Sequence, residues 1–173
     1  MSLLNLKPLA PKPEVLKQIG DYLISLGLRI VDQDFQRPWG GFFVIDESQI
    51  KTFKNLFFDK VNLTEQQYGM KLSPKFLVVS PAARLSWQYH HRRAELWKLI
   101  AGEAGIVRSQ TDEQGKVQAM KIGETLSLFQ GERHRLVGLE NWGVVAEIWI
   151  HTDPAYPSDE SDIVRVSDDY SRN

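Results

Sequence analysis

Cysteine is absent from this chain of 173 residues. Its absence excludes disulfide bonds, thiolate zinc sites and cysteine nucleophiles. The chain also lacks a basic start followed by an apolar run, and no apolar stretch is long enough to span a bilayer. A net charge of -1 gives no general attraction to nucleic acid or to anionic membranes. We therefore expect a cytoplasmic protein that binds neither nucleic acid nor membrane, in which any anion site is a local cluster of bases.

The length and composition are those of one globular domain. Hydrophobic residues make up 42% of the chain and charged residues 25%, and we find no internal repeat or low-complexity segment. We expect residues 1–36 to form an N-terminal arm and a helix packed on the main domain. That domain would span residues 37–173.

Short helices are expected in two regions. After Pro13, which suits a first helical turn, apolar residues recur at helical spacing as far as Gly27, a suitable end. A helical insertion is expected over about residues 47–73. Asp46 would cap its first helix, and another short helix would begin at Thr64.

The chain beyond Ser73 is rich in short segments of β type. These are KFLVVS, RLSWQYH, ELWKLIAG, AGIVRS, KVQAMKIG, TLSLF, HRLVGL and VVAEIWI, separated by Gly, Pro or polar turns. An earlier strand is expected over residues 42–45, after a turn at residues 39–41. Regularly spaced short strands predict a mainly β sandwich or barrel.

Four side chains form a candidate metal site: Gln88, His90, Glu95 and His134. Gln88 and His90 are two apart, so they share one face of a strand. Glu95 has the opposite parity and joins them only if a turn intervenes, for which HRRA is suited. His134 follows the turn-like QGER and precedes an apolar strand. The set suits Zn, Mn, Fe, Co or Ni, and the absence of sulfur does not choose among them. The alternative is ordinary strand residues with hydrogen bonds.

Two segments around these residues resemble the cupin motifs. Residues 82–102 resemble G-x5-H-x-H-x3,4-E-x6-G, with Gln88 in place of the first His and Ala82 in place of the first Gly. Residues 123–138 resemble G-x5-P-x-G-x2-H-x3-N, with Phe129 in place of Pro and Gly138 in place of Asn. The resemblance implies a jelly-roll barrel, the double-stranded β-helix, and a bound divalent metal ion, for which zinc is our leading expectation.

The segment LSWQYHHRRAELW narrows the resemblance. It is similar to the signature LSLQ-x-H-x-x-R-A-E-x-W of the type II mannose-6-phosphate isomerases. Further blocks resemble that family in the same order: RPWG, ERHRLVG and the closing AEIWIHTDPAYPSDESDIVRVSDDYSR. The departures are the insertion, the added HTDPAYPS, and Ser171 where Gly is usual. The nucleotidyltransferase domain of bifunctional relatives is not seen, so we expect a cupin domain that acts alone.

The resemblance implies aldose–ketose isomerisation of a phosphorylated sugar. Mannose-6-phosphate to fructose-6-phosphate is the leading reaction, and another sugar phosphate such as a heptose phosphate is an alternative. A non-catalytic sugar-binding cupin is a second hypothesis. A third is another cupin enzyme, such as a dioxygenase or a nucleotide-sugar epimerase, which the arginines and the Gln ligand disfavour. A homodimer is left open.

The resemblance also implies roles for individual residues. Arg37, Arg93 and Arg165 would bind the substrate and its phosphate, because a guanidinium matches phosphate oxygens bidentately. Arg93 and Arg165 would in addition act in catalysis; the alternative for each arginine is a structural salt bridge. Glu147, flanked by apolar residues, is the candidate general base, and its alternative role is as a buried partner of a metal-ligating His. His91 is the second candidate base.

Overall fold

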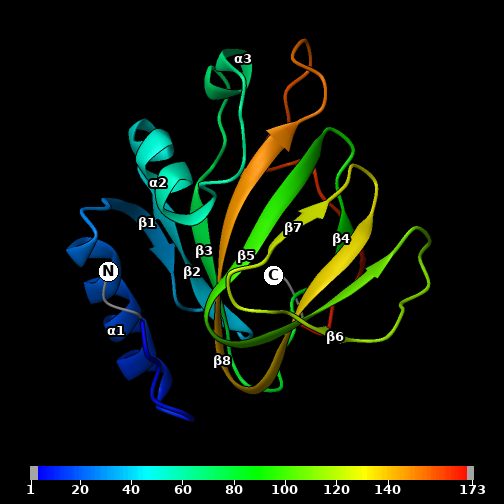
Figure 1. Cartoon of the computed structure of the whole chain (residues 1–173). Helices are drawn as coiled ribbons and strands as arrows, with labels where there is room; N and C mark the ends of the chain where they lie inside the picture. The colour runs from blue at the N-terminus through cyan, green and yellow to red at the C-terminus, as the bar shows by residue number, and fades with distance from the viewer. Residues whose placement is uncertain (1–3, 171–173) are drawn as a thin grey trace.

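The structure is a computed structural model that describes residues 4–170, and it consists of antiparallel strands with helices along one side (Figure 1). The helical elements are α1 (Lys12–Ser25), the 3-10 turn η1 (Glu47–Gln49), α2 (Ile50–Phe57) and α3 (Glu65–Tyr68). The strands are β1 (Ile30–Asp34), β2 (Gly40–Ile45), β3 (Lys75–Val79), β4 (Trp87–Tyr89), β5 (Arg93–Ser109), β6 (Gln118–Ala119), β7 (Thr125–Leu128), β8 (Arg133–His151) and β9 (Val164–Ser167). The mainly β expectation is confirmed. Within residues 4–170, no helix combines the length and apolar character needed to cross a membrane.

The strands pair in the order β1-β2-β3-β8-β4-β9, and β5 pairs with β6, β7 and β8. The two long strands are the frame of the barrel, because each contributes to both of its sides. Near its C-terminal end β8 pairs with β3, and near its start it pairs with β4. The element β5 runs antiparallel to β8 over most of its length. The sequence predicts two separate strands on either side of Gly102, and the structure has one bent strand, β5, in their place.

The bend in β5 depends on Gly102. Its φ of 71° is favourable only for glycine, and a Cβ there would lie 1.8 Å from the carbonyl oxygen of Trp142 on β8. Register shifts in the β5–β8 pair flank this position. Glycine thus lets the two long strands curve together without interrupting either of them. The sequence pattern instead predicts a strand break at this glycine.

The expected helices are confirmed, except that Asp46 caps the 3-10 turn η1 rather than α2, which begins at Ile50. The helix α1 carries a proline in its first turn and is followed by Gly27 with φ of 77°. The carboxylate of Asp46 accepts a hydrogen bond from the backbone N–H of Ser48 at the start of η1. Thr64 and Gln67 form a reciprocal capping box on α3. These ends are specified by local chemistry, so sequence alone located them.

Two features near the start of the barrel differ from expectation. A strand over residues 30–34 was not expected, yet β1 pairs with β2 along one edge of the sheet. Gly40 belongs to β2 rather than to a turn. It has φ of 143°, and a Cβ on it would lie 1.9 Å from the carbonyl oxygen of Val78 on β3. This close approach of two strands explains the glycine.

The helices cover one face of the sheet and leave the other face to the barrel interior (Figure 1). Phe53 and Phe57 of α2 pack on Phe76 of β3, with ring centroids 5.1 Å apart in each pair. On the opposite face, Leu77 belongs to a separate buried cluster with Leu99 and other interior residues. Because side chains alternate along a strand, residues in phase with Leu77 and Leu99 face the interior, where the polar residues described next are found.

Candidate metal centre and its cavity

Three buried side chains converge inside the barrel: His90 after β4, Glu95 on β5 and His134 on β8. One potential ligand atom from each lies within 4.8 Å of the others. The Nε2 atom of His90 is 3.1 Å from Glu95 Oε1, and that of His134 is 3.5 Å from Glu95 Oε2. The expected turn at HRRA brings Glu95 to this face, since a bend precedes β5.

The surroundings orient both imidazoles toward the carboxylate. The Nδ1 atom of His90 lies 2.6 Å from the carbonyl oxygen of Asp162, and that of His134 lies 2.9 Å from the carbonyl oxygen of Glu132. A carbonyl only accepts, so Nδ1 carries the proton and the other ring nitrogen faces inward.

The buried lone pairs at the centre of this group fit a divalent cation. Glu95 Oε2 and His134 Nε2 have no hydrogen-bond partner within the described residues. Buried polar atoms without a partner are unusual and costly. A metal ion bound by imidazole and carboxylate would satisfy them, so His90, Glu95 and His134 can hold one.

Gln88 lies beside this group. It is directly opposite His134 in the β4–β8 pair, so the two side chains share a face, and it lines the interior cavity. Its Oε1 accepts a hydrogen bond of 2.6 Å from the hydroxyl of Ser86. This position of Gln88 is compatible with its predicted role as the fourth metal ligand. That role stays a prediction.

Arg93 lies beside both Glu95 and the ring of His90, whose Nε2 is 3.5 Å from Arg93 Nη2. Its Nε donates to Glu95 Oε1 at 2.9 Å, and its Nη1 donates to Ser158 Oγ at 2.9 Å and to the carbonyl of Asp159 at 3.0 Å. Its guanidinium carbon lies 4.0 Å from the ring centroid of Trp149. The side chain is buried and largely committed to protein partners.

Glu95 is held as a carboxylate by these neighbours. Burial raises the pKa of Glu95, but the adjacent His90, His134 and Arg93 outweigh burial and hold the pKa well below its ordinary value. A carboxyl that stays ionised is suited to ligating a cation.

Glu147, the predicted base, is buried in a different environment. Its neighbours across the sheet are Lys75 on β3 and Trp97 on β5. Its Oε2 accepts a hydrogen bond of 2.8 Å from the indole Nε1 of Trp97, and its Oε1 lies 3.8 Å from Lys75 Nζ. Burial raises the pKa of Glu147, the charge of Glu95 adds to the rise, and Lys75 opposes it.

A cavity of about 460 Å³ adjoins both carboxylates. Glu95, Glu147 and Trp97 line it, and so do Arg37 and Gln88. It can therefore present a ligand to the metal group and to Glu147 together.

A smaller cavity of about 150 Å³ brings Arg37 and Arg165 together. Arg165 on β9 pairs in register with Gln88 on β4. Arg37 also forms an ion pair with Asp34, with 2.9 Å between Nε and Oδ2. Two of the three arginines expected at the substrate mouth are thus neighbours, although 128 positions separate them in the chain (165 − 37).

His91, the second candidate base, lies elsewhere. Its side chain is exposed, packs edge-on against Tyr89 with ring centroids 5.3 Å apart, and is not among the residues that line either cavity.

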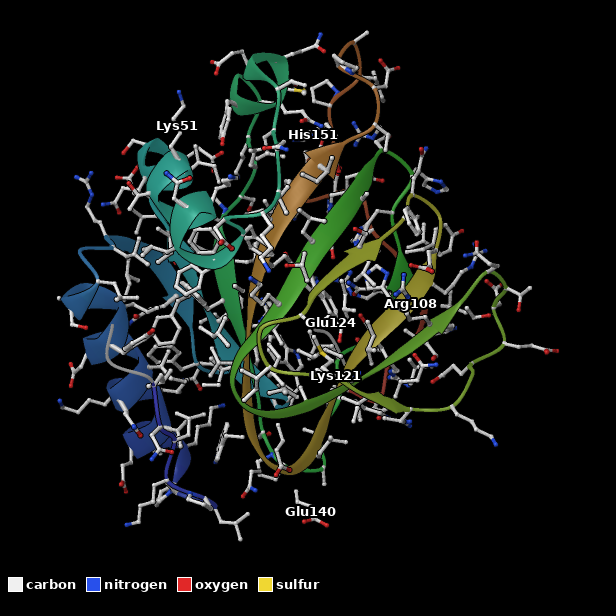
Figure 2. The ribbon with its side chains drawn as sticks, viewed as in Figure 1. Lys51, Arg108, Lys121, Glu124, Glu140 and His151 are labelled. Atoms are coloured by element: carbon white, nitrogen blue, oxygen red, sulfur yellow. The ribbon has the colours of Figure 1, made fainter. Side chains whose placement is uncertain are left out.

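The closing segment is tied into the site. The carboxylate of Asp162 accepts hydrogen bonds from the backbone N–H groups of His91 and Arg92, at 2.9 and 3.0 Å. His151, labelled near the end of β8 in Figure 2, links this segment to the insertion. Its Nδ1 accepts from the N–H of Ser158 at 2.9 Å, and its Nε2 lies 2.5 Å from the carbonyl of Lys71.

The sequence interpretation missed Lys75 as a residue of the cavity. Its position contained a signal, because alternation along KFLVVS places Lys75 in phase with the buried Leu77 and Val79. A lysine on the interior face of a strand usually has a buried partner. The partner, Glu147, comes from a strand that lies far away in sequence.

The double-stranded β-helix with a His–Glu–His group in its interior defines this protein as a cupin. An oxalate oxidase in complex with glycolate has the same fold, with a TM-score of 0.50 and 14% identity over 77% of this chain and 58% of that one. Within the cupins, the family described as "Mannose-6-phosphate isomerase C-terminal" matches residues 61–168, and the chain belongs to that family.

Two curated relatives are much longer than this chain. The mannose-1-phosphate guanylyltransferase of Salmonella montevideo is 30% identical over 144 residues, which are 83% of this chain and 24% of that protein. The xanthan biosynthesis protein XanB of Xanthomonas campestris pv. campestris (strain ATCC 33913) is 29% identical over 136 residues, 79% of this chain and 23% of that protein. The chain therefore spans about a quarter of the length of these relatives.

Proposed function

We propose that this chain is a metal-dependent sugar-phosphate isomerase that interconverts mannose-6-phosphate and fructose-6-phosphate. The observation that carries the proposal is the pairing of two buried carboxylates on one cavity. Glu95 belongs to the His–Glu–His group, whereas Glu147 accepts a hydrogen bond from the indole of Trp97 on the same cavity. Their unlike surroundings support a ligating role for Glu95 and a proton-transfer role for Glu147.

Aldose–ketose isomerisation moves one proton between C1 and C2 of the sugar. Glu147 is the group we assign to this transfer. The indole of Trp97 fixes one of its oxygens, while the other faces the cavity side on which Lys75 lies. A raised pKa suits a carboxylate that must take up the carbon-bound proton and return it near neutral pH.

The His–Glu–His group supplies the second requirement, which is stabilisation of charge on a substrate oxygen. A divalent cation held by His90, Glu95 and His134, with Gln88 as the proposed fourth ligand, would polarise that oxygen as a Lewis acid. Arg93 holds Glu95 in place through its Nε. Its Nε and Nη1 are engaged by Glu95, Ser158 and Asp159, so we assign it a positioning role at the wall of the cavity that it helps to line.

The phosphate is assigned to Arg37 and Arg165, which share the smaller cavity next to Gln88. Their guanidinium groups would bind phosphate oxygens in pairs of hydrogen bonds. The ion pair with Asp34 would orient the guanidinium group of Arg37.

The test is turnover of a panel of hexose, pentose and heptose phosphates by the purified, metal-loaded protein. We expect conversion of mannose-6-phosphate, and a drop of about 10²–10⁴ in kcat for Glu147→Gln, which keeps the shape and removes the base. Deuterium incorporation at C2 from heavy water should fall with it. Preference for another sugar phosphate would revise the substrate, and binding without turnover of any of them would refute the isomerase.

A further inference from the structure

Lys75 lies between two carboxylates at the wall of the main cavity. Its Nζ is 3.8 Å from Oε1 of Glu147 and 3.7 Å from Oε1 of Glu160. Its side chain is only 13% exposed, and its ammonium lies 4.9 Å from the ring centroid of Trp149. A lysine in this setting has lost most of its hydration, so its charge acts strongly on its neighbours.

The two carboxylates do not take the full hydrogen-bonding capacity of the Lys75 ammonium. Both carboxylate distances are longer than the usual hydrogen-bond distance. The Glu160 side chain is 68% exposed, so that ion pair is screened by water and contributes little. Glu147 is the buried partner. Lys75 therefore faces the cavity with hydrogen-bond donors still able to reach a bound molecule.

From this placement we propose that Lys75 is a second catalytic residue of the isomerase, one that transfers the proton between the two reacting sugar oxygens while Glu147 transfers the proton between the carbons. The inference rests on the proposed function. It deepens that function by dividing the two proton transfers between neighbouring groups.

Two such groups close the proton balance. In the aldose-to-ketose direction, Glu147 takes the proton from C2, the C–H electron pair forms the C1–C2 double bond, and the C1 carbonyl pair moves to O1. The Lys75 ammonium gives a proton to O1, and the resulting amine takes the proton from the O2 hydroxyl as the C2 carbonyl forms. Glu147 then gives its proton to C1. Both side chains return to their starting states, and nothing is oxidised or reduced.

The neighbouring charges favour this division. Before proton transfer, the ammonium of Lys75 is balanced by the Glu147 carboxylate. When Glu147 becomes neutral by taking the carbon proton, the negative charge moves to the sugar oxygen. The ammonium then loses its buried counter-charge, and only the exposed Glu160 remains, at the moment when a new anion develops in the same cavity, so its interaction strengthens in the transition state.

Three variants test the inference in the full, metal-loaded protein. Lys75→Met keeps most of the length of the side chain and removes the charge, Lys75→Ala leaves room for a small amine, and Lys98→Met is the matched control. Lys98 lies on β5 next to Trp97, so it points away from the interior, and its Nζ is 5.8 Å from the ring centroid of Phe58.

We expect Lys75→Met to lower kcat by about 10²–10³ with a smaller change in KM, and Lys98→Met to match the parent. Methylammonium added to Lys75→Ala should raise its kcat in a saturable manner, since a free amine can then supply the missing proton donor. Metal content and the thermal transition should stay at parental values. A purely structural lysine would not respond to added amine.

The inference is overturned if Lys75→Met keeps parental kcat, if methylammonium has no effect on a folded Lys75→Ala, or if neither variant folds. An active parent with an unaffected Lys75→Met would refute this inference alone. A parent that isomerises no sugar phosphate would refute the proposed function and this inference with it.

Discussion

The indole nitrogen of Trp97 donates a hydrogen bond of 2.8 Å to Oε2 of Glu147, across the β5–β8 strand pair. Trp97 also packs edge-on against His134, with ring centroids 5.3 Å apart. One aromatic side chain therefore touches both the proposed base and the histidine of the metal group. The two parts of the site are built on a shared rigid support, which is what precise positioning of catalytic groups requires.

The first prediction concerns this hydrogen bond. Replacing Trp97 with Phe removes the donor, and a hydrogen bond to a charged group contributes about 1.5–3 kcal/mol. Its loss disfavours the carboxylate, so the pKa of Glu147, already raised by burial, should rise further. Because the base form exists above that pKa, the acid limb of the kcat profile should move to higher pH by roughly one to two units. Assays across pH measure the shift.

Metal content in the Trp97→Phe variant is the control, since a change in occupancy would also alter the profile. An acid limb that stays in place, or moves to lower pH, would contradict the assignment of Glu147 as the group that titrates.

The second prediction concerns the metal group. The double variant His90→Ala/His134→Ala removes two of the three converging ligands and should yield folded protein without stoichiometric divalent metal. Elemental analysis of the purified protein makes the measurement. His91→Ala is the matched control, because His91 is adjacent in sequence but exposed. Full metal occupancy in the double variant would show that the ion binds elsewhere.

The third prediction concerns the closing segment. Asp162 is buried, and its carboxylate accepts hydrogen bonds from two backbone N–H groups and from the hydroxyl of Ser158. Asp162→Ala leaves these donors without partners and should lower the free energy of unfolding by about 2–4 kcal/mol. Urea denaturation measures the loss. Asp153→Ala, an exposed residue of the same segment, should cost much less.

A point substitution tests this segment better than a truncation does. Removing residues 161–173 would delete Asp162 together with β9, so it would damage folding as well as turnover. A stability loss in Asp162→Ala no larger than in Asp153→Ala would mean that the segment is held by other contacts.

The fourth prediction concerns the bend in β5. Gly102→Ala introduces a Cβ at φ of 71° that would lie 1.8 Å from the carbonyl oxygen of Trp142. Gly123→Ala introduces one at φ of 83° with nothing within 4 Å. The second change should cost only the backbone strain, about 1 kcal/mol, and the first should cost several times more, because two strands must separate. Thermal or chemical denaturation of both variants checks the ratio, and equal losses would show that the close approach relaxes freely.

Local sequence patterns predicted much of the site. Strand parity and the HRRA turn predicted that His90 and Glu95 would share an interior face, and their convergence with His134 is what the structure has. A cap at Asp46 and the start of a short helix at Thr64 were predicted from equally local patterns. These features depend on residues a few positions apart, so their chemistry is visible in the sequence itself.

Local patterns gave a wrong prediction at Gly102, where a strand was expected to end. A glycine can end a strand or let it bend past a neighbour, and the choice depends on what lies across the sheet. At Gly102 the neighbour is the backbone of Trp142, which is 40 positions away (142 − 102). Two strands were therefore expected where β5 continues.

The sequence by itself determined which functional groups this protein has, namely imidazoles, carboxylates and guanidinium groups but no thiols. It also determined on which face of each strand they lie. Only the tertiary structure decided how the two buried carboxylates differ. Glu95 is surrounded by two histidines and Arg93, which stabilise its charge. Glu147 is flanked by Trp97 and Lys75, partners brought from β5 and β3 by strand register. Since the pKa of a buried carboxyl depends on the charges packed around it, its role is a property of the fold.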